Sequence, residues 1–169
     1  QMFESALRDG LTKVYNKRYF SERLKAEFAY AVRHHFPVSL FMFDLDHFKR
    51  FNDTYGHLCG DAVLVEMARR ITSSIRSEDV FARYGGEEFA LITRGIPHEH
   101  TLILADRLRQ SIANHPFLYE NQQLSVTVSI GVASLPHPLI SSPQEFIEAA
   151  DRALYQAKRN GRNQVCSFN

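Results

Sequence analysis

Apolar residues recur at helical spacing in four stretches of this chain, and strand-like patterns separate the stretches. The four stretches predict helices over residues 19–35, 61–75, 99–113 and 142–161. The last helix has the clearest start, because Ser142 is a good N-cap, Pro143 suits the first helical position and Glu145 completes a capping box. Gly161 marks its expected end.

The strand-like patterns predict a sheet. Residues 38–45 are apolar almost throughout, which is typical of a central strand buried on both faces. Apolar and polar residues alternate over 124–132, which predicts a half-exposed strand, and we expect a short last strand over 164–168. The order of elements predicts an α+β sandwich with a ferredoxin-like, antiparallel-rich sheet that helices cover mainly on one face. Such a fold implies no activity by itself.

Two glycines, Gly85 and Gly86, lie between strand-like runs, so residues 80–93 predict a β-hairpin. A Gly-Gly pair suits a two-residue turn, because glycine tolerates the positive φ that tight turns need. The missing side chains also let a substrate lie against the backbone. Glu87 and Glu88 follow directly, and hydrophobic strands do not usually place two acids after a turn without a functional reason.

Asp44 ends the run 38–45, and Lys49 follows it closely. If the two strand segments are neighbours, the carboxylates of Asp44 and Glu87 converge at one edge of the sheet. Hard oxygen ligands gathered there suit Mg²⁺, and a lysine nearby supplies positive charge where a phosphate becomes more negative. The alternative is that both acids cap strand ends in water and that Lys49 is a solvated surface residue.

Residues 52–61 link the central strand to the second predicted helix and contain Asn52, His57 and Asp61. A carboxylate and an amide together can recognise guanine, since the carboxylate accepts from N1–H and the 2-amino group while the amide donates. The alternative is helix capping, for which Asp61 after Gly60 is well suited.

Composition bounds the function. The chain has 169 residues, of which 44% are apolar and 23% charged, with a net charge of +1. We therefore expect one domain over residues 1–169 and no bulk electrostatic binding to nucleic acid or membranes.

Cys59 and Cys166 lack disulfide or metal-ligand spacing, which suits a reducing compartment. No run reaches the roughly 18 apolar residues of a membrane span. The chain opens in a helix-like stretch, which we interpret as a domain cut from a longer protein.

At this point the chain resembles the GGDEF domain, the catalytic module of bacterial diguanylate cyclases. The resemblance covers nearly the whole chain, from residues 9–12 to residues 160–163. Its motifs, in order, are Asp44-Leu45-Asp46-His47-Phe48-Lys49, the stretch 52–61, Gly85-Gly86-Glu87-Glu88-Phe89, Ser129-Ile130-Gly131-Val132 and the stretch 150–158. Residues 85–89 correspond to the active GGEEF form of the family motif. A nucleotidyl-cyclase, palm-like fold is implied.

The resemblance also implies residue roles. Mg²⁺ or Mn²⁺ is expected to bind Asp44, Glu87 and the carbonyl of Leu45. Glu87 is the expected proton acceptor for the attacking 3′-hydroxyl, and Lys49 is expected to stabilise the transition state. The expected nucleotide-binding residues are His47, Phe48, Asn52, His57, Asp61, Gly85, Gly86, Glu88, Lys158 and Arg162. Lys158 and Arg162 are four apart, hence on one helical face if the helix persists; otherwise they are cations favoured at a helix C-terminus.

The implied reaction joins two GTP molecules into cyclic di-GMP and releases two pyrophosphates. Each domain holds half of the reaction centre, so a homodimer is required. The resemblance also implies an N-terminal sensor or receiver domain in the full-length protein. It implies a cytoplasmic location for this domain, which can belong to a full-length protein that is anchored in a membrane. We expect neither nucleic acid nor membrane contact by the domain itself.

Arg76 and Asp79 form an R-x-x-D pattern five residues before the glycine pair, which in this family is a product-inhibition site. Arginine can hydrogen-bond guanine in a bidentate manner, and Arg107 matches the position of a secondary contact. The alternative assigns Arg76 to a helix end and Asp79 to a turn.

Two positions depart from the family pattern: Lys13 stands where glycine is usual, and Lys17 replaces the first of two arginines. They concern the N-terminal loop more than the chemistry.

Two other functions stay open. The domain can be a non-catalytic receptor for GTP or cyclic di-GMP, although the retained acids and lysine favour catalysis. An RNA-binding module shares the ferredoxin-like core, but the balanced charge argues against it.

Overall fold

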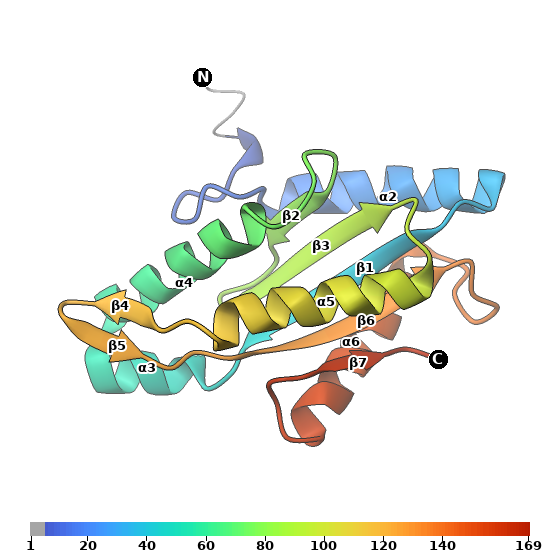
Figure 1. Cartoon of the computed structure of the whole chain (residues 1–169). Coiled ribbons are helices and arrows are strands. Elements are labelled where there is room, and N and C mark those ends of the chain that lie inside the picture. The colour runs from blue at the N-terminus through green and yellow to red at the C-terminus, as the bar shows by residue number, and fades with distance from the viewer. Residues whose placement is uncertain (1–5) are drawn as a thin grey trace.

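A computed structural model describes residues 6–169, so the helix expected at the first residues lies outside the described part. A five-stranded sheet in the order β2-β3-β1-β6-β7 forms the centre (Figure 1). The strands are β1 (Val38–Leu45), β2 (Val80–Arg83), β3 (Glu88–Arg94), β6 (Val128–Leu135) and β7 (Val165–Ser167). β1 pairs antiparallel with β3 and β6, while β6 and β7 are parallel. The expected antiparallel-rich α+β fold is confirmed.

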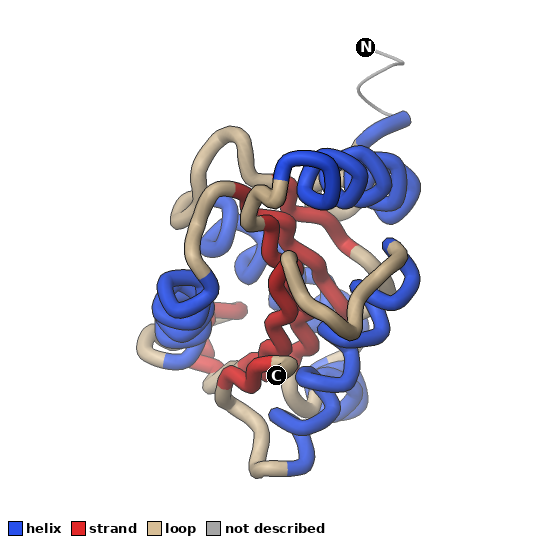
Figure 2. Tube along the Cα trace, turned by 90° about the vertical axis from the view of Figure 1, so that its right-hand side faces the viewer, coloured by secondary structure: helices blue, strands red, loops and turns tan. Residues whose placement is uncertain are grey.

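Helices cover both faces of this sheet, so the expectation of one covered face is wrong. One face packs against α2 (Lys17–His34) and α6 (Pro143–Arg159), through apolar residues such as Phe20 and Phe146. The other packs against α4 (His57–Thr72) and α5 (His98–Ala113), through residues such as Met67 and Leu108. Figure 2 shows the strands edge-on between the two sets of helices. β1 can be apolar on both sides because both sides are covered.

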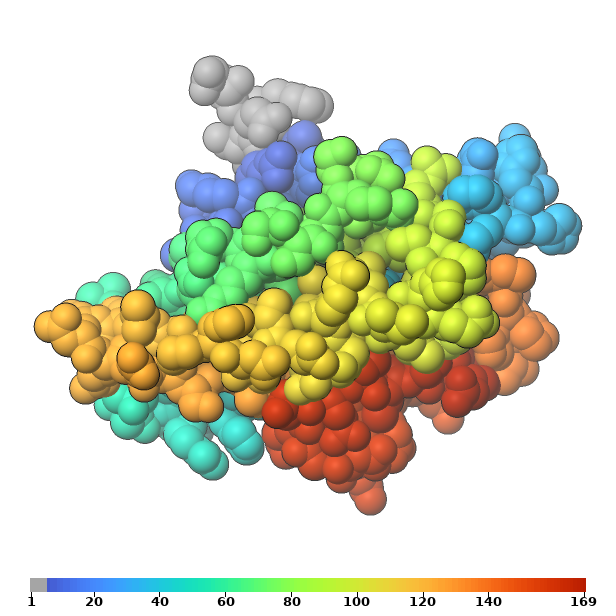
Figure 3. Space-filling model, in the orientation of Figure 1, coloured from blue at the N-terminus to red at the C-terminus, as the bar shows by residue number. Residues whose placement is uncertain are grey.

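β6 also differs from its expected half-exposed state, since nearly all of its residues are buried. Its serine at 129 is fully buried and hydrogen-bonded, so polarity there does not indicate exposure. Leu124, the first residue of the predicted run, belongs to a separate hairpin of β4 (Phe117–Tyr119) and β5 (Gln122–Leu124), and residues 125–127 link this hairpin to β6. This hairpin forms one end of the molecule in the space-filling view, beside α4 and α5 (Figure 3).

The second predicted helix begins earlier than expected and has a short helix before it. α3 (Phe48–Tyr55) follows β1 almost directly, and α4 begins at His57. Asp61 is therefore inside α4 and is not its N-cap, which corrects the capping alternative. Gly56, with φ of 92°, separates the two helices.

Helix ends elsewhere follow local chemistry. The Asn16 side chain caps α2 by accepting from the Tyr19 amide, so the helix begins two residues before its predicted start. Ser142 caps α6 as expected and accepts from the Glu145 amide at 3.1 Å. The Glu145 carboxylate accepts from the Ser141 amide at 2.8 Å, one residue before the partner that a standard capping box uses. None of the helices within residues 6–169 is long and apolar enough to span a membrane.

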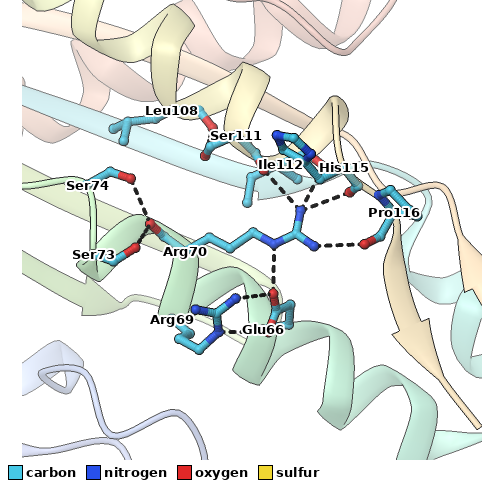
Figure 4. Close-up of polar contacts among 10 residues, drawn as sticks. All are labelled: Glu66, Arg69, Arg70, Ser73, Ser74, Leu108, Ser111, Ile112, His115 and Pro116. Atoms are coloured by element: carbon cyan, nitrogen blue, oxygen red, sulfur yellow. Dashed lines mark hydrogen bonds and ion pairs between the residues drawn. The ribbon is translucent and has the colours of Figure 1, made fainter.

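A cluster around Arg70 ties α4 to the end of α5 (Figure 4). Its guanidinium donates to four carbonyl oxygens at or just after the α5 C-terminus, those of Ser111, Ile112, His115 and Pro116. It also donates to Glu66 at 2.8 Å, and Glu66 accepts from Arg69. The last carbonyls of a helix lack intrahelical donors, so Arg70 satisfies groups that would otherwise be unpaired.

Candidate active site

The end of β1 meets the hairpin turn at one edge of the sheet. β1 and β3 pair so that Asp44 lies opposite Glu88, and the Leu45 amide donates to the Glu87 carbonyl at 3.4 Å. The predicted proximity of the two acidic segments is therefore present. The turn itself is wider than two residues, because the amides of Tyr84 and Gly85 both donate to the Glu88 carbonyl.

Neither Gly85 nor Gly86 has a positive φ, so the first expected reason for the glycine pair, tolerance of positive φ, is wrong. The second expected reason was the space that missing side chains leave, and it can be examined at each glycine. A Cβ on Gly85 would lie 3.0 Å from a Glu88 carboxylate oxygen, while a Cβ on Gly86 would meet nothing within 4 Å. Gly85 is thus packed under Glu88, and Gly86 leaves an open backbone beside the pocket.

Burial disfavours the charged forms of the carboxylates at this edge. Asp44 is 7% exposed and contacts the Lys158 ammonium. Burial raises the pKa of Asp44 and outweighs the opposing effect of Lys158. Burial also raises the pKa of Glu87, and the neighbouring charge of Asp44 adds to that rise. A bound cation would relieve both effects.

Two adjoining pockets contain the predicted site residues. The smaller, about 190 Å³, is lined by Asp44, Leu45, Asp46, His47, Phe48, Lys49, Glu87, Lys158 and Arg162. The larger, about 460 Å³, is lined by Phe48, Lys49, Asn52, His57, Asp61, Leu64, Arg83, Gly86, Glu87 and Glu88. Phe48, Lys49 and Glu87 border both, so a nucleotide can extend across them. Of the predicted nucleotide residues, Gly85 alone lines neither pocket.

The larger pocket is built by the contact between α3 and α4. His57 and Asp61 lie one turn apart on α4 and so share a face. Asn52 reaches them from α3, and it packs so closely on Gly60 that a Cβ there would lie 1.9 Å from its amide oxygen. Any larger residue at position 60 would displace Asn52.

Lys158 and Arg162 line the smaller pocket together, although they do not share a helical face. α6 ends at Arg159, and Arg162 follows in a turn with φ of 65°. The helix does not continue to Arg162, so the condition for a shared helical face is not met, but both cations line one pocket because the turn folds back toward the sheet.

Arg76 and Asp79 border a different cavity, of about 780 Å³, between the N-terminal loop and the end of α4. Asp79 accepts from the Arg76 amide at 2.9 Å and from its guanidinium at 3.3 Å. Burial raises the pKa of Asp79, while these hydrogen bonds oppose the rise. Arg107 lines a separate, shallow pocket on α5, so one cavity does not contain all three residues.

The backbone conformation at Lys13 is unusual for a residue other than glycine. Lys13 has φ of 67°, a conformation that glycine adopts at little cost, which is a physical reason for glycine at this position in the family. The Lys17 ammonium lies 4.4 Å from the centre of the Tyr84 ring, next to the glycine turn.

Sequence reasoning missed two residues of the site. The Arg83 guanidinium donates to the carbonyls of Gly85 and Gly86 and forms a 3.4 Å ion pair with Asp9. Asp46 lines the smaller pocket but turns both oxygens toward other partners. A second acid at the end of a buried strand was the available signal for Asp46.

No three His, Cys, Asp or Glu side chains within residues 6–169 gather as a metal site by themselves. The expected ligand set has only two carboxylates and one backbone carbonyl, which is fewer side chains than such a group requires. The buried Asp44 and the partly buried Glu87, both of raised pKa, lie beside an accessible pocket and suit a divalent cation that keeps positions open for phosphate oxygens.

Comparisons with known proteins decide the family. The sequence model of the family described as "Diguanylate cyclase, GGDEF domain" matches residues 6–164. The chain belongs to this family. It is 40% identical over 158 residues to the probable diguanylate cyclase DgcC of Escherichia coli (strain K12), covering 94% of this chain and 42% of that protein. The GGDEF domain thus spans less than half of this relative.

Solved structures agree with the family assignment. The GGDEF domain of DgcB from Caulobacter crescentus, in complex with c-di-GMP, superimposes with a TM-score of 0.91 at 36% identity, covering 96% of each chain. The active GGEEF domain of a diguanylate cyclase from Vibrio cholerae gives a TM-score of 0.84 at 37% identity, covering 91% of this chain and 97% of that one.

Proposed function

We propose that this GGDEF domain condenses two GTP molecules into cyclic di-GMP and two pyrophosphates. The observation that carries the proposal is the convergence of Asp44, from β1, and Glu87, from the turn directly before β3, beside the cations of one pocket. Relatives named as diguanylate cyclases, and the DgcB domain solved in complex with c-di-GMP, support the same chemistry.

Asp44, Glu87 and the Leu45 carbonyl would hold Mg²⁺ or Mn²⁺. When bound, such an ion polarises the α-phosphate and favours ionisation of a hydroxyl next to it. Glu87 accepts the proton of the attacking 3′-hydroxyl, a role that suits a carboxylate whose pKa is raised by burial and by Asp44. The hydroxyl oxygen bonds to the α-phosphorus of the other GTP, the bond from that phosphorus to the β-phosphate bridge breaks, and pyrophosphate leaves.

The remaining residues orient the nucleotide. Asp61 and Asn52 can hydrogen-bond the guanine, with His57 on the same pocket wall. His47 and Phe48 border the smaller pocket, where their amides can approach phosphate oxygens. Lys49, Lys158 and Arg162 place three positive charges near the triphosphate, where charge develops on the leaving pyrophosphate.

Two copies of the domain must face each other during turnover. Each copy has one nucleotide pocket of the described kind, whereas the product joins two nucleotides through two bonds. The homodimer is therefore the catalytic unit, and each copy supplies one GTP. We further propose that an N-terminal sensor or receiver domain controls this pairing in a longer protein, and that the domain works in the cytoplasm, where GTP is available.

The test is turnover by the purified 169-residue chain. Incubation with GTP and Mg²⁺ at high protein concentration should produce cyclic di-GMP and pyrophosphate in a 1:2 ratio. Glu87→Ala should abolish production while its circular dichroism matches the starting protein, and Glu148→Gln on the exposed face of α6 should not change the rate. GTP binding without turnover, even with an added dimerising tag, would favour the receptor function instead.

Product inhibition at Arg76 and Asp79 is the second part of the proposal. The large cavity beside them and the buried Asp79 support it, because both residues border a space of sufficient size for a ligand. Calorimetry should show cyclic di-GMP binding at micromolar levels, and Arg76→Ala should weaken it and relieve inhibition. Unchanged inhibition in Arg76→Ala would remove this site from the proposal.

A further inference from the structure

Asp46 is a buried carboxylate that the proposed chemistry leaves without a role. It lies one residue beyond β1 and is 4% exposed. Ser129 Oγ donates to its Oδ1 at 2.6 Å. Its Oδ2 accepts from Thr127 Oγ1 at 2.6 Å and from the Asn163 amide at 3.0 Å. These three donors are neutral, so the carboxylate remains buried through hydrogen bonds alone.

The Asn163 amide belongs to an unusual turn after α6. Gly161, Arg162 and Asn163 have φ values of 122°, 65° and 48° in succession. Residues other than glycine rarely adopt positive φ, and they keep it where the surrounding structure holds them. Besides Asp46, the Ala157 carbonyl accepts from the Arg162 amide at 3.0 Å, and Arg109 donates to the Asn163 side chain at 2.9 Å.

This turn decides where Arg162 lies. A residue three positions beyond the end of α6 would otherwise be on a free loop, but the turn brings Arg162 into the smaller pocket. We propose that Asp46 is a positioning residue, whose Oδ2 holds the turn at Arg162–Asn163 and thereby directs Arg162 to the phosphates of the nucleotide. This inference rests on the proposed GTP site.

The competing role for Asp46 is a third metal-binding carboxylate. Its two oxygens already accept three hydrogen bonds, and these direct the carboxylate toward β6 and the turn. Asparagine separates the two roles. Its oxygen can accept from Thr127 and Asn163, and its amide can donate to the Ser129 hydroxyl, but it lacks the charge that a metal ligand supplies.

A double-mutant cycle tests whether Asp46 acts through Arg162. Asp46→Ala and Arg162→Ala should each raise the KM for GTP by about tenfold with a smaller change in kcat, since a charged phosphate contact is lost. The double variant should raise KM no further than Arg162→Ala alone, because the two residues form one unit. Multiplied effects, near a hundredfold, would overturn the inference.

Two variants serve as controls in the same assay. Asp46→Asn should raise the KM for GTP much less than Asp46→Ala does. An equal rise in KM in both variants would favour the metal-binding role. Ser129→Ala removes a donor to Oδ1 and leaves the Oδ2–Asn163 contact in place. It should lower the melting temperature and leave the KM for GTP unchanged. If Asp46→Ala does not fold, Arg109→Ala replaces it in the cycle. The Arg109 substitution removes the hydrogen bond to the Asn163 side chain and so loosens the same turn.

A readout without turnover separates this inference from the proposed function. Hydrogen exchange at the Asn163 amide should be slow in the starting protein and at least tenfold faster in Asp46→Ala. GTP binding measured by calorimetry in EDTA should weaken equally in Asp46→Ala and Arg162→Ala. Absence of cyclic di-GMP from the starting protein would sink the proposed function alone. Unchanged exchange at Asn163, or binding lost in Arg162→Ala but kept in Asp46→Ala, would overturn the role of Asp46.

Discussion

In two groups of charged side chains in this domain, the native structure shifts the carboxylate pKa values in opposite directions. In the Arg70 cluster, one carboxylate faces two guanidinium groups, and hydrogen bonds from Arg69 lower the pKa of Glu66 to about 2. At the end of β1, the Lys158 ammonium pairs with Asp44 and its charge also acts on Glu87, yet burial raises the pKa of both acids.

The difference separates a structural cluster from a functional one. Folding favours the ionised form of Glu66, because its partners surround it in the native state. Folding disfavours the ionised forms of Asp44 and Glu87, so stability does not explain their presence. Carboxylates whose ionised form is disfavoured by folding are expected where a protein keeps room for a cation and a phosphate ligand.

The strongest way to test this comparison is Glu87→Gln. Loss of the proton acceptor should reduce cyclic di-GMP formation about 100-fold or more. The same change should raise the melting temperature at pH 7 without divalent cations. The raised pKa means that Glu87 contributes stability at low pH, which is lost as pH rises through its folded pKa, and glutamine removes that loss.

Differential scanning calorimetry of Glu87→Gln with and without Mg²⁺ makes the result specific. Mg²⁺ should raise the melting temperature of the starting protein and have less effect on the variant. A variant that melts below the starting protein at pH 7 would contradict the raised pKa of Glu87.

Breaking the Arg70 cluster should lower the stability of the domain and leave its catalytic activity unchanged. Arg70→Ala removes donors from four carbonyl oxygens and from Glu66, so we expect a loss of about 2–4 kcal/mol in the free energy of unfolding. Urea denaturation measures the loss. Arg69→Ala is the matched control, since the Arg69 side chain is 66% exposed and its loss should lower the stability far less than Arg70→Ala. Equal losses would show that the carbonyl contacts contribute little.

The smallest predicted effect concerns the pH dependence of the same cluster. Because the folded pKa of Glu66 is about 2 and its ordinary value is 4.5, its contribution is present above pH 4.5 and is lost as pH falls toward 2. Glu66→Gln should therefore cost about 1–2 kcal/mol at pH 7, after allowance for its partial exposure, and progressively less at pH 4 and pH 3. Denaturation at these three pH values checks it, and a pH-independent difference would contradict the lowered pKa.

Prediction from the sequence succeeded where a local pattern was decisive. The run 38–45 became β1 without a change of bounds, and the third helix was misplaced by one residue. Errors arose where neighbours far along the chain set the environment. The serine at 129 indicated exposure, yet it is buried because Asp46 provides an acceptor. The short helix α3 was missed because its polar residues face a pocket and none of its residues is buried.

For the candidate site, most of the expected residues lie in the two adjoining pockets, and their roles stay predictions. The sequence could identify Asp44, Glu87 and Lys49 because acids and a lysine stand out at the ends of apolar strands. It showed Asp46 only as a second acid at the end of a buried strand and gave no signal for Arg83, because position at a strand end does not specify the hydrogen-bond partners of a side chain. Only their contacts with the glycine turn and with the turn after α6 distinguish them.

The amino-acid order by itself determined the strands, most helix positions and the motifs of the GGDEF family, since these depend on periodicity and on residues close in the chain. The tertiary structure decided that helices cover both sheet faces, that Asp44 meets Glu87, and that Arg162 turns back toward them. These outcomes depend on pairings between residues more than 40 positions apart. The free energy of such contacts comes from the packed core and its burial, which no local pattern specifies.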